Sequence, residues 1–391
     1  MAVNHIKRKL IGLPYFVCAV LDVHCRAHQF DEHELHRFMY RLGSAGVDYI
    51  RLFPFWGKEV PPYRKQHGGQ YDLELLNPQY WTNLTRVCEA AYAWKIGIYF
   101  DLFDHCGTKY GRDWSNREWN PWYNNSQSVD GIYAIDDIAL RYYKKWIRKV
   151  WQTVGIRGEF IRKDGSRRKL HPNLYGLGNE LDSRQAWDTK VERDNWGVKW
   201  GHDLAAYLWR LGYRKEILWS AERETSHVLR ACLDKGDPLI RRIRPDCPWG
   251  KKDTVAQYHG WISRLNPDSV QEVVRNTRVR KIAYSDDGVN FKWGGDGICV
   301  EADGKQKYCS ADTRSVIRLC RYIHENLEKG YQFHHIEQLP RSVSEVGHSL
   351  DDLKQHRDVN IYKRIAEQVW GVDITRTYPR WLKQRHGIQD V

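Results

Sequence analysis

The feature that most constrains this chain is a series of short apolar runs that recurs along its whole length. Each run has the length of a buried β-strand, and the stretches between the runs show the apolar spacing of amphipathic helices. Eight strands that alternate with helices over 391 residues predict an α/β protein with a (β/α)8 TIM barrel, rather than an open doubly wound sheet. The predicted strands lie near residues 14–22, 47–55, 96–104, 174–180, 216–222, 254–260, 281–288 and 331–339.

The same pattern predicts a single domain over residues 1–391. No Pro- or Ser-rich linker, low-complexity tract or repeat beyond the strand–helix alternation divides the sequence. No glycine-rich dinucleotide or phosphate fingerprint follows the first predicted strand, which argues against a Rossmann domain. Helical spacing is clearest over 31–46, 78–95 and 139–155, and residues 352–370 supply the helix expected to close the barrel.

Composition narrows the class of ligand. The chain has 18 Trp and 23 Tyr but only 2 Met, which is more aromatic side chains than a core alone usually needs. This excess predicts surfaces that stack on flat ligands, either sugars or nucleobases. The net charge of +13 favours encounters with anions but does not specify a fold. Because the sequence has no recognisable nucleic-acid motif, we expect no nucleic-acid partner, and no apolar stretch approaches the roughly 18 residues of a membrane span.

The N-terminal segment and the cysteines set further expectations. A basic start followed by the apolar run 10–21 imitates a secretory signal, but Pro14 and the β-rich composition predict the first barrel strand instead. With no convincing leader, the default compartment is the cytoplasm. The nine cysteines lack paired C-x-x-C spacing, so we expect reduced thiols and no zinc site. Cys299 and Cys309 flank a turn signal and could face each other across a hairpin, although reduced neighbours are the favoured interpretation.

Barrel enzymes carry their reactive groups at the carboxyl ends of the strands. Acids, histidines and indoles gather at those positions in this sequence, without a G-x-S-x-G nucleophile or an evident metal cluster. Two carboxylates that face each other across an aromatic groove are what glycoside hydrolysis requires, because one donates a proton while the other stays ionised. The strand-end residues are Asp22, His24, Arg51, Trp56, Asp104, His105, Asn179, Glu180, Glu222, His259, Trp261, Asp286, Asp287 and Glu337.

Three segments carry a resemblance to a known family, namely "YDLELLNPQYWTNLTRVCEAAYAWKIGIYFDLFD" (71–104), "GVDYIRLFPFW" (46–56) and "GLGNE" (176–180). They resemble the clan A glycoside hydrolases, in particular the cellulase-like family 5. The first is similar to the second helix and third strand of that family, the second to its second strand, and the third to its fourth strand. The resemblance spans roughly residues 11–371, and its specific part is 71–104 together with Asn179-Glu180.

The resemblance implies a role for each matching residue. Glu180 corresponds to the acid/base, and Asn179 to the residue that contacts the sugar 2-hydroxyl. The alternative for this pair is a solvated loop that caps the next helix. Arg51 corresponds to the arginine that supports the nucleophile. His259 corresponds to the histidine of the sixth strand, with a structural histidine as the alternative.

The second carboxylate is expected on the seventh strand, where Asp286 stands in the place of the family's glutamate nucleophile. The shorter side chain withdraws the carboxylate by about 1.5 Å. Because inverting enzymes hold their two carboxyl groups further apart than retaining ones, this change favours the inverting geometry if the backbone is unchanged. A shifted strand end, another acid such as Asp287 or Glu337, or binding without cleavage are the other interpretations.

Several positions depart from the family pattern. Trp261 stands where a tyrosine is more usual. On the third strand Phe103 takes the histidine place, and His105 lies two residues further along. The family's strand-eight tryptophan is not evident, and Glu337 or His335 occupies that region instead.

Loops after the strands are predicted to hold the aromatic side chains of the sugar cleft. The segment "DWSNREWNPWYNN" (113–125) carries three Trp, among them Trp114, and one Tyr. Trp56 and Trp293 occupy similar loop positions, although any one of these rings could belong to the core. The basic cluster 161–169 falls between a helix and the fourth strand, so we expect a solvated hairpin at the opposite end of the barrel.

Together these observations predict a barrel glycosidase that cleaves a β-linked oligo- or polysaccharide by a retaining mechanism. Glu180 and Asp286 are the predicted catalytic pair, and no metal or organic cofactor is needed because two carboxylates and a water complete the chemistry. The alternatives are an inverting glycosidase and a carbohydrate-binding barrel without turnover. The sugar, the linkage and the oligomeric state are not determined by the sequence.

Overall fold

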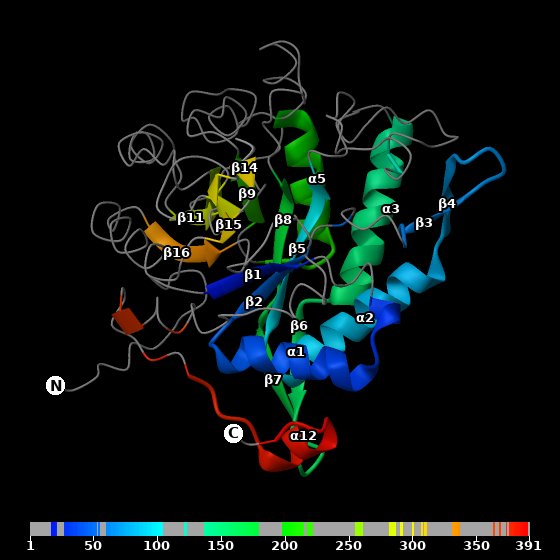
Figure 1. The fold of residues 1–391 in the computed structure, drawn as a ribbon. Coiled ribbons are helices and arrows are strands. Elements are labelled where there is room, and N and C mark those ends of the chain that lie inside the picture. Colours follow the sequence, from blue (N-terminus) through cyan, green and yellow to red (C-terminus); the bar gives the residue numbers. More distant parts are fainter. Residues whose placement is uncertain are drawn as a thin grey trace.

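Eight parallel β-strands close into a barrel, and their order around the ring follows their order in the chain (Figure 1). The strand predicted for the N-terminal apolar run is the first of them, and it pairs with the second strand on one side and with the last on the other. All eight predicted strands are confirmed. They are β1 (Val17–Leu21), β2 (Tyr49–Leu52), β5 (Gly97–Asp104), β8 (Leu174–Asn179), β9 (Ile217–Ala221), β10 (Val255–Gly260), β11 (Lys281–Asp286) and β16 (Tyr331–Ile336).

The structure is a computed structural model. For β1 and for the strands between residues 217 and 336 it describes the backbone only. The described residues are 17–21, 27–52, 54, 60–104, 121–122, 137–179, 198–214, 217–221, 255–260, 281–286, 290–291, 299–300, 306–307, 309–310, 331–336, 363, 367–368, 373 and 375–389.

The hydrogen-bonding register shows how steeply the strands tilt. Each strand is paired with its neighbours at defined residues, for example Cys18 with Tyr49 and Tyr49 with Gly97. If the pairings are followed from a residue of β1 through all the other strands, they return to β1 at a position eight residues earlier in the sequence. Eight strands with a shear of eight is the geometry of the inner barrel in TIM-type folds, in which the lumen is just wide enough to be filled by side chains.

Helices follow the first four barrel strands, and their first residues carry the caps that the sequence supplies. Asp31 accepts a hydrogen bond from the Glu34 backbone N–H at 2.7 Å, and the Glu34 carboxylate accepts one from the Asp31 N–H, which makes a capping box. Asn77 caps the next helix just before Pro78. None of the described helices is both long and apolar enough to cross a membrane. They are α1 (Glu32–Ser44), α2 (Pro78–Ala93), α3 (Asp137–Val154) and α5 (Val198–Arg210), together with the short η2 (Ala27–Gln29) before α1 and α12 (Arg380–Arg385) near the C-terminus.

Two antiparallel hairpins interrupt the alternation of strands and helices. The first pairs β3 (Tyr63–Lys65) with β4 (Tyr71–Leu76). The second pairs β6 (Arg157–Ile161) with β7 (Arg167–Pro172), so the prediction of a solvated hairpin for the basic cluster 161–169 is confirmed. This hairpin follows the end of α3 and precedes β8, which places it at the amino ends of the strands (Figure 1).

Short strands near the C-terminal half test the suggestion about the cysteines. β13 (Cys299–Val300) pairs with β14 (Gln306–Lys307), and β12 (Asn290–Phe291) pairs with β15 (Cys309–Ser310). Cys299 is opposite Lys307, whereas Cys309 is opposite Phe291 in the other ladder. The suggestion that Cys299 and Cys309 face each other across one hairpin is therefore wrong, because the intervening residues divide between two separate ladders.

A cluster of aromatic rings fills the space between β5 and the helices outside it. Phe103 lies within 5.3–5.9 Å, ring centre to ring centre, of Trp122, Tyr143 and Trp200. Trp146 on α3 joins them and donates its indole N–H to the Leu102 carbonyl at 2.7 Å. The hydrogen bond satisfies the Trp146 indole, and burial of the rings removes a large apolar area from water.

The cluster corrects the interpretation of the aromatic composition. Trp122 belongs to the segment 113–125 that was predicted to contact sugar, yet its side chain is fully buried. For this residue the other interpretation, burial in the core, is the correct one, because the ring packs between α3 and β5. Trp81, Trp94, Trp146 and Trp200 are also buried, so in the described part of the chain much of the Trp excess is structural.

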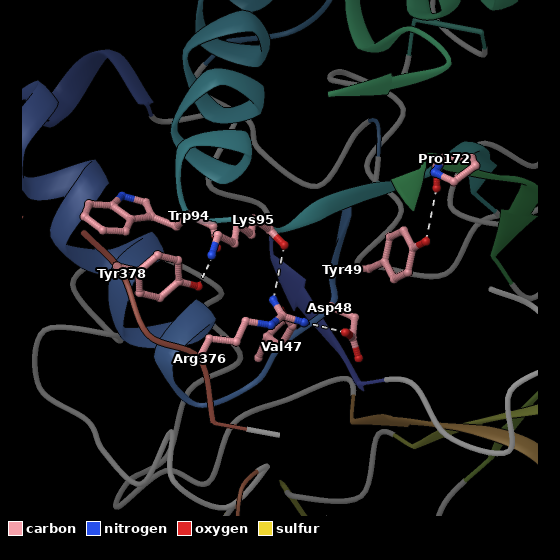
Figure 2. A network of polar contacts seen from close by, with 8 residues as sticks. All are labelled: Val47, Asp48, Tyr49, Trp94, Lys95, Pro172, Arg376 and Tyr378. Carbon is pink, nitrogen blue, oxygen red and sulfur yellow. Dashed lines mark hydrogen bonds and ion pairs between the residues drawn. The ribbon is translucent and has the colours of Figure 1, made fainter. Parts of the chain in front are cut away.

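The C-terminal segment, residues 375–389, packs at the amino end of the barrel beside the starts of β2 and β5 (Figure 2). The Arg376 guanidinium donates hydrogen bonds to the carbonyl oxygens of Val47 at 2.7 Å and Lys95 at 3.1 Å, and it pairs with the Asp48 carboxylate. Val47 and Asp48 precede β2, and Lys95 precedes β5. One guanidinium therefore joins the starting points of two neighbouring strands to the end of the chain.

Aromatic and imidazole rings continue this closure beside α1. The Tyr378 hydroxyl donates to the Trp94 carbonyl at 2.6 Å, and the Trp94 indole N–H donates to His36 Nδ1 at 3.2 Å. His386 is stacked on His36 with ring centres 3.7 Å apart and planes 5° from parallel. Both imidazoles are buried, so the stack is stable only while the rings are neutral.

The surroundings of the stack disfavour a positive charge on either ring. Burial lowers the pKa of His36 to about 3, with smaller contributions from His386, Arg385 and His33. The pKa of His386 is lowered as well, first by burial and then by Arg385, and Glu32 acts in the opposite direction. Protonation of these rings at acidic pH would therefore work against the docking of the C-terminal segment.

This stack predicts an acid-sensitive contribution to stability. Between the ordinary histidine pKa near 6.5 and the folded value near 3, the unfolded chain binds a proton at His36 that the folded chain does not, so stability rises with pH in that window. We expect the free energy of unfolding to fall by up to about 1.4 kcal/mol for each pH unit below 6. His36→Gln should flatten this slope in urea titrations at several pH values, whereas the exposed His67→Gln should not. An unchanged slope in His36→Gln would contradict the assignment.

Candidate active site

A buried ion pair between β2 and β5 is the main polar feature of the described barrel interior. Arg51 Nε donates to Asp101 Oδ2 at 2.6 Å, and Arg51 Nη2 lies 2.5 Å from the same oxygen. Neither side chain has any solvent exposure. The Arg51 guanidinium also lies 5.0 Å from the centre of the Tyr99 ring, which adds a cation–π contact. Charges this deeply buried are tolerated because each provides the other's partner.

Neighbouring residues show that this pair lies inside the barrel. Tyr175 on β8 packs against Trp151 of α3, so it faces the helices. Gly176, the next residue, therefore faces the lumen, because successive residues of a strand point to opposite faces. A Cβ added at Gly176 would overlap the Asp101 carboxylate and press on the Tyr99 ring. The absence of a side chain at position 176 thus creates the space that the carboxylate occupies.

A second glycine plays the same part closer to the amino end of the barrel. The Tyr49 ring lies over Gly97, and a Cβ at that position would overlap the ring. The Tyr49 hydroxyl donates to the Pro172 carbonyl at 3.1 Å (Figure 2). Both tyrosine and arginine of β2 therefore fill the lumen below its carboxyl end, where a TIM-type barrel is solidly packed.

The described ends of β8 and β11 carry the residues on which the predicted chemistry depends. β8 ends at Asn179, the residue before Glu180, and β11 ends at Asp286. Two strands, β9 and β10, separate them around the ring, so the two ends lie nearly across the barrel from each other. Because all eight strands are parallel, both ends open on the same face of the barrel.

The register connects the end of β11 to Arg51. Asp286 is paired with Ile336, Ile336 with Ala19, and Ala19 with Ile50, which is the residue before Arg51. On the other side of the ring, Asp101 is paired with Gly176, three residues before the end of β8. Gly176, and with it the Asp101 carboxylate, therefore lies about 10 Å before the end of β8, measured along the strand. The ion pair belongs to the layer of side chains beneath the open face of the barrel.

Most of the predicted site lies outside the described residues. The structure describes the backbone of Asn179, His259 and Asp286 but not their side chains, and His259 is paired with Ser285 in the ladder between β10 and β11. Of the predicted residues, Arg51 alone is described in full. The others, which lie outside the described part, are Glu180, Trp56, His105, Trp114, Trp261, Trp293 and Glu337.

Asp101 is the functional candidate that the sequence analysis missed. The strand-end reading selected Asp104 and His105 from "FDLFDH" and passed over the acid in the middle of the strand. A signal was present, because a carboxylate within a buried strand needs a charged partner. Arg51, in the adjacent strand of the predicted barrel, was the available cation.

Among the described residues, Glu32, His36 and His386 form the one group of three that is close enough to hold a metal ion. The geometry opposes this use. An imidazole binds a metal along the lone pair in its own plane, and two stacked rings have parallel planes that do not meet at one ion. In addition, His36 Nδ1 already accepts the Trp94 N–H. The group acts as a structural stack at the amino end of the barrel.

Comparison with solved structures gives the class of fold to which this barrel belongs. A mannosidase of glycoside hydrolase family 5 from Rhizomucor miehei is 11% identical, with a TM-score of 0.54, over 93% of this chain and 96% of the other. The exo-β-1,4-mannosidase Op5Man5 from Opitutaceae bacterium strain TAV5 is 14% identical, with a TM-score of 0.54, over 91% of this chain and 60% of the other. A GH5_18 protein from Bifidobacterium longum in complex with Manβ1-4GlcNAc is 12% identical, with a TM-score of 0.53, over 92% and 79%.

These likenesses show the fold. The chain has the barrel fold of family 5 glycoside hydrolases, as the resemblance in the sequence implied. No protein-family model matches the chain, and no curated protein matches it in sequence. The chain spans 60% of the length of the Opitutaceae enzyme.

The buried pair predicts a large asymmetry between single and double substitutions. Asp101→Asn leaves the Arg51 guanidinium buried without its carboxylate, so we expect a loss of about 3–5 kcal/mol in the free energy of unfolding. The double variant Arg51→Met with Asp101→Leu removes both charges and should recover most of this loss. Urea denaturation measures each value.

Glu159→Gln provides the matched control for this experiment. Glu159 is paired with Arg167 at 3.2 Å in the exposed hairpin, so its substitution should cost less than about 1 kcal/mol. A double variant that is as unstable as Asp101→Asn would show that the lost energy is packing rather than unpaired charge.

Proposed function

We propose that this chain is a glycoside hydrolase that cleaves a β-linked oligo- or polysaccharide, and that residues 1–391 form a single (β/α)8 domain. The observation that carries the proposal is the placement of Asn179 and Asp286. They end two strands on nearly opposite sides of a closed parallel barrel that has the fold of family 5 enzymes. The open face that these strand ends share is where barrel enzymes bind their substrates.

Glu180 and Asp286 have complementary roles in the proposed retaining mechanism. The Asp286 carboxylate attacks the anomeric carbon while Glu180 gives its proton to the leaving glycosidic oxygen. A water then releases the sugar from Asp286, and Glu180 takes the proton of that water. The two half-reactions return both carboxyl groups to their starting protonation states.

Arg51 is proposed to act as a positioning residue. Its guanidinium is fully buried and bonded to Asp101, which supports a role in orienting carboxylates rather than a direct contact with sugar. The ladder that connects β11 to β2 brings Asp286 into register with Ile50, the neighbour of Arg51, and a positive charge near the end of β11 favours an ionised Asp286.

The residues proposed to bind the sugar follow from the sequence resemblance to family 5 glycoside hydrolases. Asn179 is proposed to bind the 2-hydroxyl, with His259 beside it. The aromatic residues predicted in loops would provide stacking faces for successive sugars. The full proposed set is Asn179, His259, Trp261, Trp56, His105, Trp114, Trp293 and Glu337.

The compared proteins suggest which sugar to test first. Two of them are mannosidases and the third was solved with Manβ1-4GlcNAc. We therefore propose β-mannosides as the first substrate class. The aspartate at position 286 favours one competing mechanism, inversion, because its shorter side chain widens the space between the two carboxyl groups.

Turnover of an aryl β-mannoside provides the direct test. Glu180→Gln should lower kcat by about 10²–10⁴-fold, because the amide can neither give nor take the proton. Asp286→Asn should be equally inactive, while Glu89→Gln, an exposed site on α2, should retain wild-type activity. The anomer first released, read by NMR, separates retention from inversion.

Two outcomes would contradict the proposal. Full activity in Glu180→Gln would remove the acid/base assignment. Binding of manno-oligosaccharides without turnover by the wild-type chain would favour a carbohydrate-binding barrel.

A further inference from the structure

A groove with an excess of basic residues runs along the outer side of α3, away from the barrel lumen. It has a volume of about 600 Å³ and lies between α3, the strand β4 and the helix α5. Four cations of α3 line it, namely Arg141, Lys144, Lys145 and Arg148. We call these four residues and the space they enclose the basic groove. A volume of this size is typical of a ligand site.

The spacing of the four cations concentrates like charge on one face of the helix. Arg141, Lys144, Lys145 and Arg148 follow the i, i+3, i+4, i+7 pattern that places side chains side by side. Like charges at these separations destabilise a helix by about 0.2–0.5 kcal/mol for each pair. A face that only needs to be solvated can avoid this cost by alternating acids with bases. The stripe is therefore a feature that a bound anion would explain.

Carboxylates of the protein neutralise this face only in part. Glu74 on β4 pairs with Lys145 and lies 3.9 Å from Arg141, and the hydrogen bond from Lys145 holds the pKa of Glu74 below its usual value. Lys144 has no hydrogen bond or ion pair within the described part of the chain, and Arg148 donates to the neutral Tyr207 hydroxyl at 2.8 Å. Asp137 at the start of α3 is the second acid in the lining, so four cations face two carboxylates, and Lys144 and Arg148 have no ion pair with a carboxylate among the described residues.

The floor of the groove distinguishes between kinds of anion. It is formed by Leu140 and Tyr207, both of which are buried. The Tyr207 ring lies 5.9 Å from the Arg148 guanidinium and 5.5 Å from that of Arg210. Single-stranded nucleic acids are bound largely by stacking of bases on exposed aromatic rings. The groove offers no exposed ring for this purpose among its lining residues, so a carbohydrate anion suits it better.

The groove begins near the open face of the barrel. Tyr143 on α3 contacts Phe103 near the end of β5, and Trp151 contacts Tyr175 nearer the start of β8. The helix therefore runs antiparallel to the strands, and Asp137 at its beginning lies toward their carboxyl ends (Figure 1). From Asp137 to Arg148 the helix rises about 16 Å, long enough for several sugar units in a row.

We propose that the basic groove binds an anionic β-linked oligosaccharide, with carboxylate groups carried on successive sugars, as a secondary site beside the open face of the barrel. The choice of a glycan rests on the proposed function, whereas the choice of an anion rests on the groove itself. One acid per sugar along an extended chain would match cations that are repeated at each turn of α3. A polymer bound there could continue toward the catalytic face.

Binding of a charged and a neutral ligand of the same backbone tests the proposal. A β-1,4-linked oligomannuronate and a β-1,4-linked manno-oligosaccharide of equal length are titrated into the full chain by calorimetry. We expect the wild type to bind the oligomannuronate more tightly, and added salt to weaken that binding. Lys144→Glu should weaken it about tenfold, which corresponds to about 1.4 kcal/mol. Lys163→Glu, the same charge change in the exposed hairpin turn, should leave the affinity within about twofold of wild type.

Separate readouts keep the two proposals distinguishable. An aryl β-mannoside is too small a substrate to reach the groove, so Lys144→Glu should still hydrolyse it. Circular dichroism should confirm that the helices of this variant are intact. No turnover of the aryl β-mannoside by the wild type would contradict the proposed enzymatic activity and would leave the binding result unaffected. Equal affinities for the two oligosaccharides, or an unchanged affinity in Lys144→Glu, would overturn the groove proposal. Tighter binding of an oligothymidylate that Lys144→Glu abolishes would also overturn it, in favour of nucleic acid.

Discussion

The ion pair between Arg51 and Asp101 is the interaction on which the interior of this barrel depends. Two charges removed from water are stable only when their geometry is correct, so they tolerate little movement of the strands that carry them. A slip of one residue between β2 and β5 would turn one partner to the opposite face and leave the other unpaired. The pair thus selects one register for two strands, and it does so in the layer immediately beneath the open end of the barrel.

The two ends of the barrel solve different physical problems. At the amino end, Tyr49 fills the lumen over Gly97, and Arg376 joins the beginnings of β2 and β5 to the C-terminal segment. At the carboxyl end, the strands stop at residues such as Asn179 and Asp286, whose side chains are polar. A tightly packed base allows the opposite face to carry groups that are poorly suited to burial, because the base supplies the stability.

Aromatic residues show how one composition can serve two purposes. A high content of Trp and Tyr is compatible with sugar binding and also with a core in which each ring finds a neighbour. Trp146 belongs to the core, since its N–H donates to the Leu102 carbonyl and its ring contacts Trp122. Composition alone does not separate these uses, because both need the same flat amphipathic side chain. Only the position of each ring relative to β5 and α3 does.

Local pattern was enough to find the eight strands, the first helices and the hairpin around the basic cluster. Each of these depends on residues close together in the chain, so the necessary information is local. The partnership of Arg51 with Asp101 and the burial of Trp122 link residues that are distant in sequence, as does the stack of His36 on His386. The sequence by itself therefore determined the elements and the class of fold. Tertiary structure alone decided which polar and aromatic side chains meet, because those contacts exist only once the barrel has closed and its register is set.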